Sequence, residues 1–160
     1  MAEAIQSMLK ENLGIQLKID YTSLTVLIER FTNGISDLWG SIWIADYPDP
    51  QNFLQLFEGS TVPEKTVDEN GEVVLEPSYT NPSRYKNDDF DYFYSKAVSA
   101  TSDKVAIENY YKADSVLIAD AAFMPIYYEH YIRLLQNNVH GFPQNALEYR
   151  DFTRVFLSKK

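Results

Sequence analysis

The residues with the clearest chemical potential lie in the run WIADYPDP at positions 43–50. Asp46 follows a segment with an alternating pattern, so it stands at the carboxyl end of a predicted strand, the edge at which open α/β sheets bind ligands. The two prolines after it restrict the turn to few conformations, which presents the carboxylate at a low entropic cost. A carboxylate on a cavity wall needs a cationic or donor partner. A ligand ammonium group is such a partner, and Trp43 offers an indole to line the same pocket.

Two other interpretations of this turn stay open from the residues alone. Asp46 can simply accept hydrogen bonds from the turn amides, as aspartates in turns often do. Asp46 and Asp49 can also be taken as paired carboxylates for acid/base catalysis. Asp49 stands directly before Pro50, however, and this order is typical of a helix cap. His130 and His140 each occur alone, which is typical of structural or surface histidines rather than of metal ligands or bases.

The composition excludes several classes of function. The 14 basic and 23 acidic residues give 14 − 23 = −9, a balance that argues against nucleic acid as a partner. The sequence contains no cysteine, which rules out disulfides, thiolate zinc sites and thiol nucleophiles. Glycine-rich phosphate loops, nucleophile elbows and HExxH zinc motifs are missing as well. We therefore expect a protein that is not an enzyme and that holds no cofactor or metal.

The first 45 residues predict helices that alternate with strands. Apolar residues at helical spacing predict one helix that ends before Gly14 and a second over 24–31. Residues 15–20 and 38–45 alternate with a period of two, the pattern of strands. A strand–helix–strand unit with short connections usually places its strands parallel. We therefore expect residues 15–20 and 38–45 to be parallel neighbours.

The rest of the chain completes a mixed α/β fold. The sequence predicts a short helix over 50–57, a polar surface excursion over 60–89 that is interrupted by prolines, two tandem helices that begin near Asp88 or Asp89 and near Thr101 or Ser102, and strand-like stretches over 124–135 and 149–157. We expect residues 1–160 to form a single domain. Because a strand normally precedes the first helix of such a pattern, we also expect a fragment of a longer protein. The alternative is a complete small domain with an N-terminal helix.

The run at 43–50, followed by Asn52-Phe53-Leu54, resembles the extracytoplasmic solute-binding proteins of oligopeptide and dipeptide ABC transporters. The resemblance continues in NPSRYKNDDFD at 81–91, in PIYY at 125–128 and in VHGF at 139–142. It covers essentially the whole chain but only the C-terminal part of such a protein. It implies one lobe of a periplasmic-binding-protein-like (type II) fold, with parallel strands linked by helices and additional C-terminal helices and strands.

In this family two lobes close over a ligand, which a membrane permease then receives. The resemblance implies that Asp46 pairs with the amino terminus of a bound peptide and that Trp43 lies beside it. It further implies that Tyr127 or Tyr128 comes from a strand facing the cleft, and Tyr47 completes the expected ligand-binding set. The implied partners are a peptide or other small solute, the missing N-terminal lobe and an ABC permease. The parent protein would be periplasmic or a cell-surface lipoprotein, with its signal absent from this chain.

A second function of a different class is also open. The chain has 12 tyrosines, more than a plain core requires, and tyrosine suits surfaces that bind other molecules. A small acidic protein-interaction domain without a small-molecule ligand would use these tyrosines as a contact patch. In that case the turn at 46–50 would be purely structural.

Overall fold

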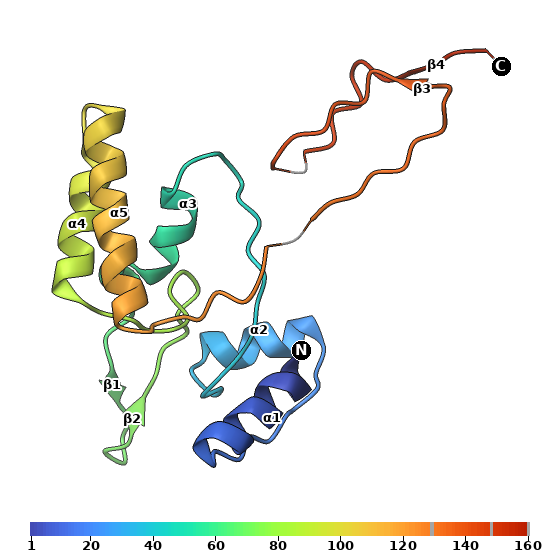
Figure 1. The fold of residues 1–160 in the computed structure, drawn as a ribbon. Coiled ribbons are helices and arrows are strands. Elements are labelled where there is room, and N and C mark those ends of the chain that lie inside the picture. Colours follow the sequence, from blue (N-terminus) through green and yellow to red (C-terminus); the bar gives the residue numbers. More distant parts are fainter. Residues whose placement is uncertain (129, 148, 160) are drawn as a thin grey trace.

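A helical hairpin holds the core of the molecule. The computed structural model describes residues 1–128, 130–147 and 149–159. Helices α4 (Asp88–Val98) and α5 (Asp103–Ala119) lie side by side, with α3 (Gln51–Leu54) against them (Figure 1). The buried apolar residues recur at helical spacing, as the sequence predicts, because each helix turns one stripe inward. They are Phe90, Tyr94 and Ala97 of α4, Tyr110, Ala113 and Leu117 of α5, and Leu54 of α3.

Local signals set the ends of the helices. Helix α1 (Ala2–Leu13) ends at Gly14, whose φ of 70° is the left-handed conformation that glycine adopts without strain. Helix α2 (Leu24–Thr32) begins after Ser23, whose side chain accepts a hydrogen bond from the Val26 amide. Both boundaries confirm the sequence prediction. The cap of helix α4 lies one residue before the predicted Asp88 or Asp89. It is Asn87, whose side chain accepts hydrogen bonds from the amides of Asp89 and Phe90.

The expected parallel pairing of residues 15–20 with 38–45 is wrong for the described part of the chain. Residues 15–20 instead lie against α1, where the Gln6 side chain donates to the Leu17 carbonyl at 2.7 Å. This bond occupies a carbonyl that a strand ladder would need. A parallel sheet must also be covered on both faces, whereas Leu38, Ile42 and Ile44 of the run at 38–45 stay exposed.

The strands that do form are short and antiparallel. Strands β1 (Thr66–Val67) and β2 (Val73–Val74) make a hairpin, and β3 (Val139–His140) pairs with β4 (Phe156–Leu157). The first hairpin agrees with the turn residues at Asn70 and Gly71. The expected strand at 124–135 is absent from its described residues, 124–128 and 130–135, and the β3–β4 ribbon lies away from the helices (Figure 1). The expected strand at 149–157 is reduced to β4, among the described residues.

Most of the stretch at 60–89 is irregular, and its end is anchored by buried polar groups. It contains the 3₁₀ helix η2 (Gly59–Thr61) at its start and the β1–β2 hairpin. Ser78 and Asn81 are fully buried. The Asn81 side chain donates to the carbonyl of Glu58, just before the stretch, and to that of Tyr85 near its end, so it ties the end of the stretch to the residues that precede it. None of the described helices is both long and apolar enough to span a membrane.

Candidate functional site

The turn at 46–50 enters helix α3 through a side-chain cap. The Asp49 carboxylate accepts a hydrogen bond from the Gln51 amide at 2.8 Å, and the Asn52 amide bonds to the Asp49 carbonyl at 3.1 Å. Pro50 directly precedes α3 and already has helical backbone angles, with φ −56° and ψ −27°, and its missing N–H costs nothing at this end of a helix. Helix α3 then continues as the 3₁₀ helix η1 (Gln55–Phe57). Asp49 therefore acts as the helix cap that the sequence indicates, and this role accounts for it without acid/base chemistry.

The turn brings Trp43 and Asp46 together around a buried amide. The indole Nε1 of Trp43 donates to the Asn52 Oδ1 at 2.8 Å, and the Asp46 backbone N–H donates to the same oxygen at 3.2 Å. The Asn52 Nδ2 donates in turn to the Asp46 Oδ2 at 3.5 Å. Asn52 is fully buried, whereas Trp43 is 46% exposed and Asp46 is exposed. The arrangement leaves an aromatic ring and a carboxylate exposed while both are hydrogen-bonded to a buried side chain.

Two tyrosines of the helical hairpin, Tyr94 of α4 and Tyr110 of α5, interact with residues 49 and 51 at this turn. Burial and the negative charge of Asp49 raise the pKa of Tyr110 to about 12. Burial also raises the pKa of Tyr94, an effect that a hydrogen bond with Gln51 partly offsets. The Tyr47 hydroxyl donates to the Gln51 side chain at 3.0 Å. The turn is therefore coupled to α4 and α5 through uncharged tyrosine hydroxyls.

The structure does not bring all of the expected site residues together. Asp46 and Tyr47 lie in the turn, and Trp43 lies three residues before it. Tyr127 and Tyr128 belong to the irregular run after α5 and are 53% and 90% exposed. No hydrogen bond or ring contact among the described residues joins either tyrosine to the turn. The sequence did not predict that the Asn52 side chain bonds to both Trp43 and Asp46, and Asn52 is noted there only as part of the motif. The available signal was a polar residue one position inside a short predicted helix, two residues before Leu54.

The two histidines lie in different surroundings. His130 is exposed, and His140 stacks on Phe156 with 5.1 Å between ring centroids while its Nε2 lies 3.1 Å from the Ser158 hydroxyl. Both contacts of His140 bridge β3 to the β4 end of the ribbon. Within the described ranges, no group of three His, Asp or Glu side chains is placed to hold a metal ion.

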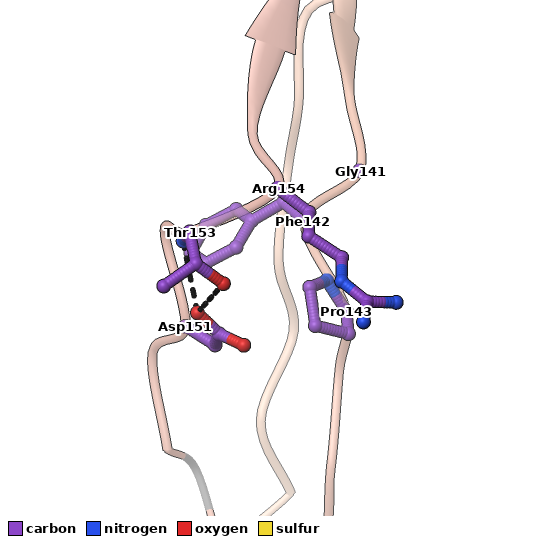
Figure 2. A pocket seen from close by; sticks show the side chains of 6 residues that line it. All are labelled: Gly141, Phe142, Pro143, Asp151, Thr153 and Arg154. Atoms are coloured by element: carbon purple, nitrogen blue, oxygen red, sulfur yellow. Dashed lines mark hydrogen bonds between the residues drawn. The ribbon is translucent and has the colours of Figure 1, made fainter.

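A separate hollow of about 530 Å³ lies on the β3–β4 ribbon (Figure 2). Its lining residues are Gly141, Phe142, Pro143, Asp151, Thr153 and Arg154. The Asp151 carboxylate accepts from both the amide and the hydroxyl of Thr153, at 2.9 and 2.6 Å, and these bonds lower its pKa. The carboxylate is thus used within the ribbon. None of the residues that the sequence singles out for binding lines this hollow.

A solved structure defines the class of fold. The unliganded open form of MppA, a periplasmic murein tripeptide-binding protein, superposes with a TM-score of 0.72 and 25% sequence identity over 99% of this chain and 28% of that protein. The chain therefore has the fold of part of a periplasmic-binding-protein-like lobe, of mixed helices and strands. No family model matches the sequence.

Curated relatives then identify the proteins to which the chain is related. It is 27% identical to the periplasmic oligopeptide-binding protein OppA of Salmonella typhimurium, over 89% of the chain and 23% of that protein. It is 27% identical to the periplasmic murein peptide-binding protein MppA of Escherichia coli, over 100% of the chain and 27% of that protein. It is 24% identical to the dipeptide-binding protein DppE of Bacillus subtilis, over 94% of the chain and 25% of that protein.

The homologues of this chain are thus oligopeptide- and dipeptide-binding proteins, and the resemblance drawn from the sequence is confirmed. The chain spans about a quarter of the length of these curated relatives. Their names describe binding proteins rather than enzymes. A free-standing acidic interaction domain is not favoured, because the similarity to these proteins extends over nearly the whole chain.

Proposed function

We propose that this chain supplies one wall of the peptide-binding cleft of an extracytoplasmic solute-binding protein that serves an ABC transporter. The observation that carries the proposal is the pair formed by Asp46 and Trp43, both turned outward from the buried Asn52. A carboxylate and an aromatic ring on one rigid turn suit a ligand with a charged amino terminus and an apolar side chain. Nothing in this pairing calls for bond making or breaking, so the proposed role is binding alone.

The proposed ligand contact is a charge-assisted hydrogen bond between the peptide ammonium and the Asp46 carboxylate. In this chain the carboxylate faces solvent, and an exposed ion pair contributes little to affinity. A second wall is needed to exclude water from the pair. We assign that wall to the other lobe of the parent protein, and Tyr127 and Tyr128 to the cleft that closure would form.

The exposed apolar side chains of the run at 38–45 support this assignment. Leu38, Ile42 and Ile44 are 67%, 59% and 52% exposed, although their alternation is that of a buried strand. Further parts of the parent would cover them. We propose that residues 1–160 form most of one lobe as a single domain, with 60–89 as its surface excursion.

The proposed partners and location follow from the relatives. A peptide, the second lobe and an ABC permease would be the partners of the parent protein. Its location would be the periplasm, in line with the periplasmic names of the relatives, or the cell surface as a lipoprotein.

The test is Asp46→Asn in the full-length parent, with trialanine and N-acetyl-trialanine as the two probes. A desolvated charge-assisted bond is worth about 1.5 to 3 kcal/mol, so the variant should bind trialanine about 10- to 150-fold more weakly. N-acetyl-trialanine should bind both proteins alike, because it has no ammonium to lose.

Asp37→Asn is the matched control, since it removes another exposed aspartate outside the turn. Equal affinity of the Asp46→Asn variant and the unaltered protein for trialanine would remove Asp46 from the site. A loss for both probes, together with a lower melting temperature, would show that Asp46 only supports the turn. The 160-residue chain alone should bind trialanine weakly or not at all by calorimetry.

A further inference from the structure

We infer that Asn52 is a positioning residue, whose buried amide sets the orientation of the Asp46 carboxylate and the Trp43 indole and so sets the preference of the site for a charged amino terminus. The ligand part of this inference rests on the proposed function. The orientation part does not, because it can be measured without a ligand.

The Asn52 side chain bonds to three groups: the Trp43 indole, the Asp46 backbone and the Asp46 carboxylate. Its Oδ1 accepts two hydrogen bonds, from the Trp43 Nε1 and the Asp46 backbone N–H, and its Nδ2 faces the Asp46 Oδ2. One oxygen that accepts twice fixes the directions of both donors. The Asn52 side chain is itself held, because its residue is 0% exposed.

The helix that carries Asn52 is fixed at both ends. Asp49 caps its start, and Gln55 Nε2 donates to the Asn52 carbonyl at 3.3 Å. Leu54, two residues on, is part of the core of the helical hairpin. The position of the Asn52 amide is therefore set by the core, and the amide transmits that position to the two outward-facing side chains.

The two oxygens of the Asp46 carboxylate differ in their hydrogen bonding. The Oδ2 faces the Asn52 amide at 3.5 Å, and among the described residues the Oδ1 accepts no hydrogen bond. A donor on one oxygen leaves the other oriented for a second donor. A ligand ammonium is the donor that this second oxygen would take.

The ligand-free experiment uses the two indole N–H resonances of the ¹⁵N-labelled chain. Asn52→Ala should shift the Trp43 resonance and speed its exchange with water about 5- to 10-fold, the effect of losing one ordinary hydrogen bond. The Trp39 resonance should stay in place, because that ring stacks on Phe31 with 4.3 Å between centroids. An unchanged Trp43 resonance would overturn the inference.

Asn81→Ala is the matched control for general destabilisation. Asn81 is as deeply buried as Asn52, but its side-chain bonds go to Glu58, Ser83 and Tyr85. It should leave the Trp43 resonance unchanged. An equal shift in both variants would show that any loss of a buried asparagine disturbs the turn, which would also overturn the inference.

The second variant, Asn52→Asp, keeps both acceptor bonds and replaces only the donor that faces Asp46. It provides a second test should Asn52→Ala fail to fold, and its Trp43 resonance should match that of the unaltered chain. The two carboxylates cannot both ionise freely at this separation, so the pair should retain a proton to higher pH than a single carboxylate does. In the full-length parent, the rise in trialanine affinity between about pH 5 and pH 7 should therefore be at least threefold larger in the variant than in the unaltered protein.

The outcomes of the two arms are distinguishable. If trialanine binds neither protein, the proposed function fails, while the indole data still decide the orientation part. If trialanine binds both proteins with the same pH profile, the Asn52 amide does not act on the Asp46 carboxylate and the inference fails. N-acetyl-trialanine should show no difference in pH profile, because it lacks the ammonium that distinguishes the two charge states.

Discussion

A substitution at Gly59 tests how the segment that follows the turn at 46–50 is attached to the helical hairpin. Gly59 is buried, and its amide donates to the Asp91 Oδ1 at 2.8 Å across 32 residues of sequence. A methyl group at position 59 would overlap the Asp91 Oδ2. Gly59→Ala must therefore push the carboxylate away and break a hydrogen bond to a charged group.

The magnitude follows from two opposed terms. Loss of a hydrogen bond to a charged group costs about 1.5 to 3 kcal/mol. The replacement of glycine at a compatible φ returns about 0.4 to 1 kcal/mol through the unfolded state, and the φ of Gly59 lies outside the left-handed region. The net expectation is a loss of about 0.5 to 2.6 kcal/mol in the free energy of unfolding.

The assay is urea unfolding of the chain followed by far-UV circular dichroism. Gly40→Ala is the matched control, because no atom lies within 4 Å of the added methyl group, and it should leave the midpoint unchanged or slightly higher. The decisive comparison is Gly59→Ala in an Asp91→Ala background. There the overlap is gone, and the substitution should be neutral or stabilising. An equal loss in both backgrounds would refute the account, since the cost would not come from Asp91.

Two further predictions concern the tyrosines behind the turn and the C-terminal ribbon. Because the pKa of Tyr110 is raised to about 12 from its ordinary 10, the folded state holds this proton more tightly, so stability is full below pH 10 and falls as the pH rises to about 12. Tyr110→Phe should reduce the loss of unfolding free energy between about pH 10 and pH 12 by about 1 to 2 kcal/mol, measured by thermal melting at each pH. An unchanged pH dependence would contradict the assigned cause. Gly141→Ala should disrupt the β3–β4 pairing, because Gly141 has a φ of 70° and a methyl group there would overlap the Arg154 carbonyl. Amide exchange should rise in the ribbon and not in α5, and protection that stays unchanged in both would count against this reasoning.

The sequence by itself determined the helices of this protein. The Gly14 and Ser23 boundaries and the Asp49–Pro50 start depend on neighbours within four residues, so they can be read from local order. The run at 43–50 likewise carried the resemblance that the relatives confirm. Each of these signals is local in the chain, and the physical forces behind it act over one turn of helix.

The tertiary structure decided what pairs with what. The alternation at 15–20 indicates that one face of an extended segment is apolar, but it does not indicate which distant segment pairs with it. Here the Gln6 side chain of α1 donates a hydrogen bond to the Leu17 carbonyl, and no strand pairs with the segment among the described residues. The placement of Tyr127 and Tyr128 away from any contact with the turn was equally beyond local pattern. Asn52 is the sharpest case, because its partners lie six and nine residues back and reach it only when the turn folds over. A buried polar side chain takes its meaning from the groups that satisfy it, and those groups are known only once the chain has closed around it.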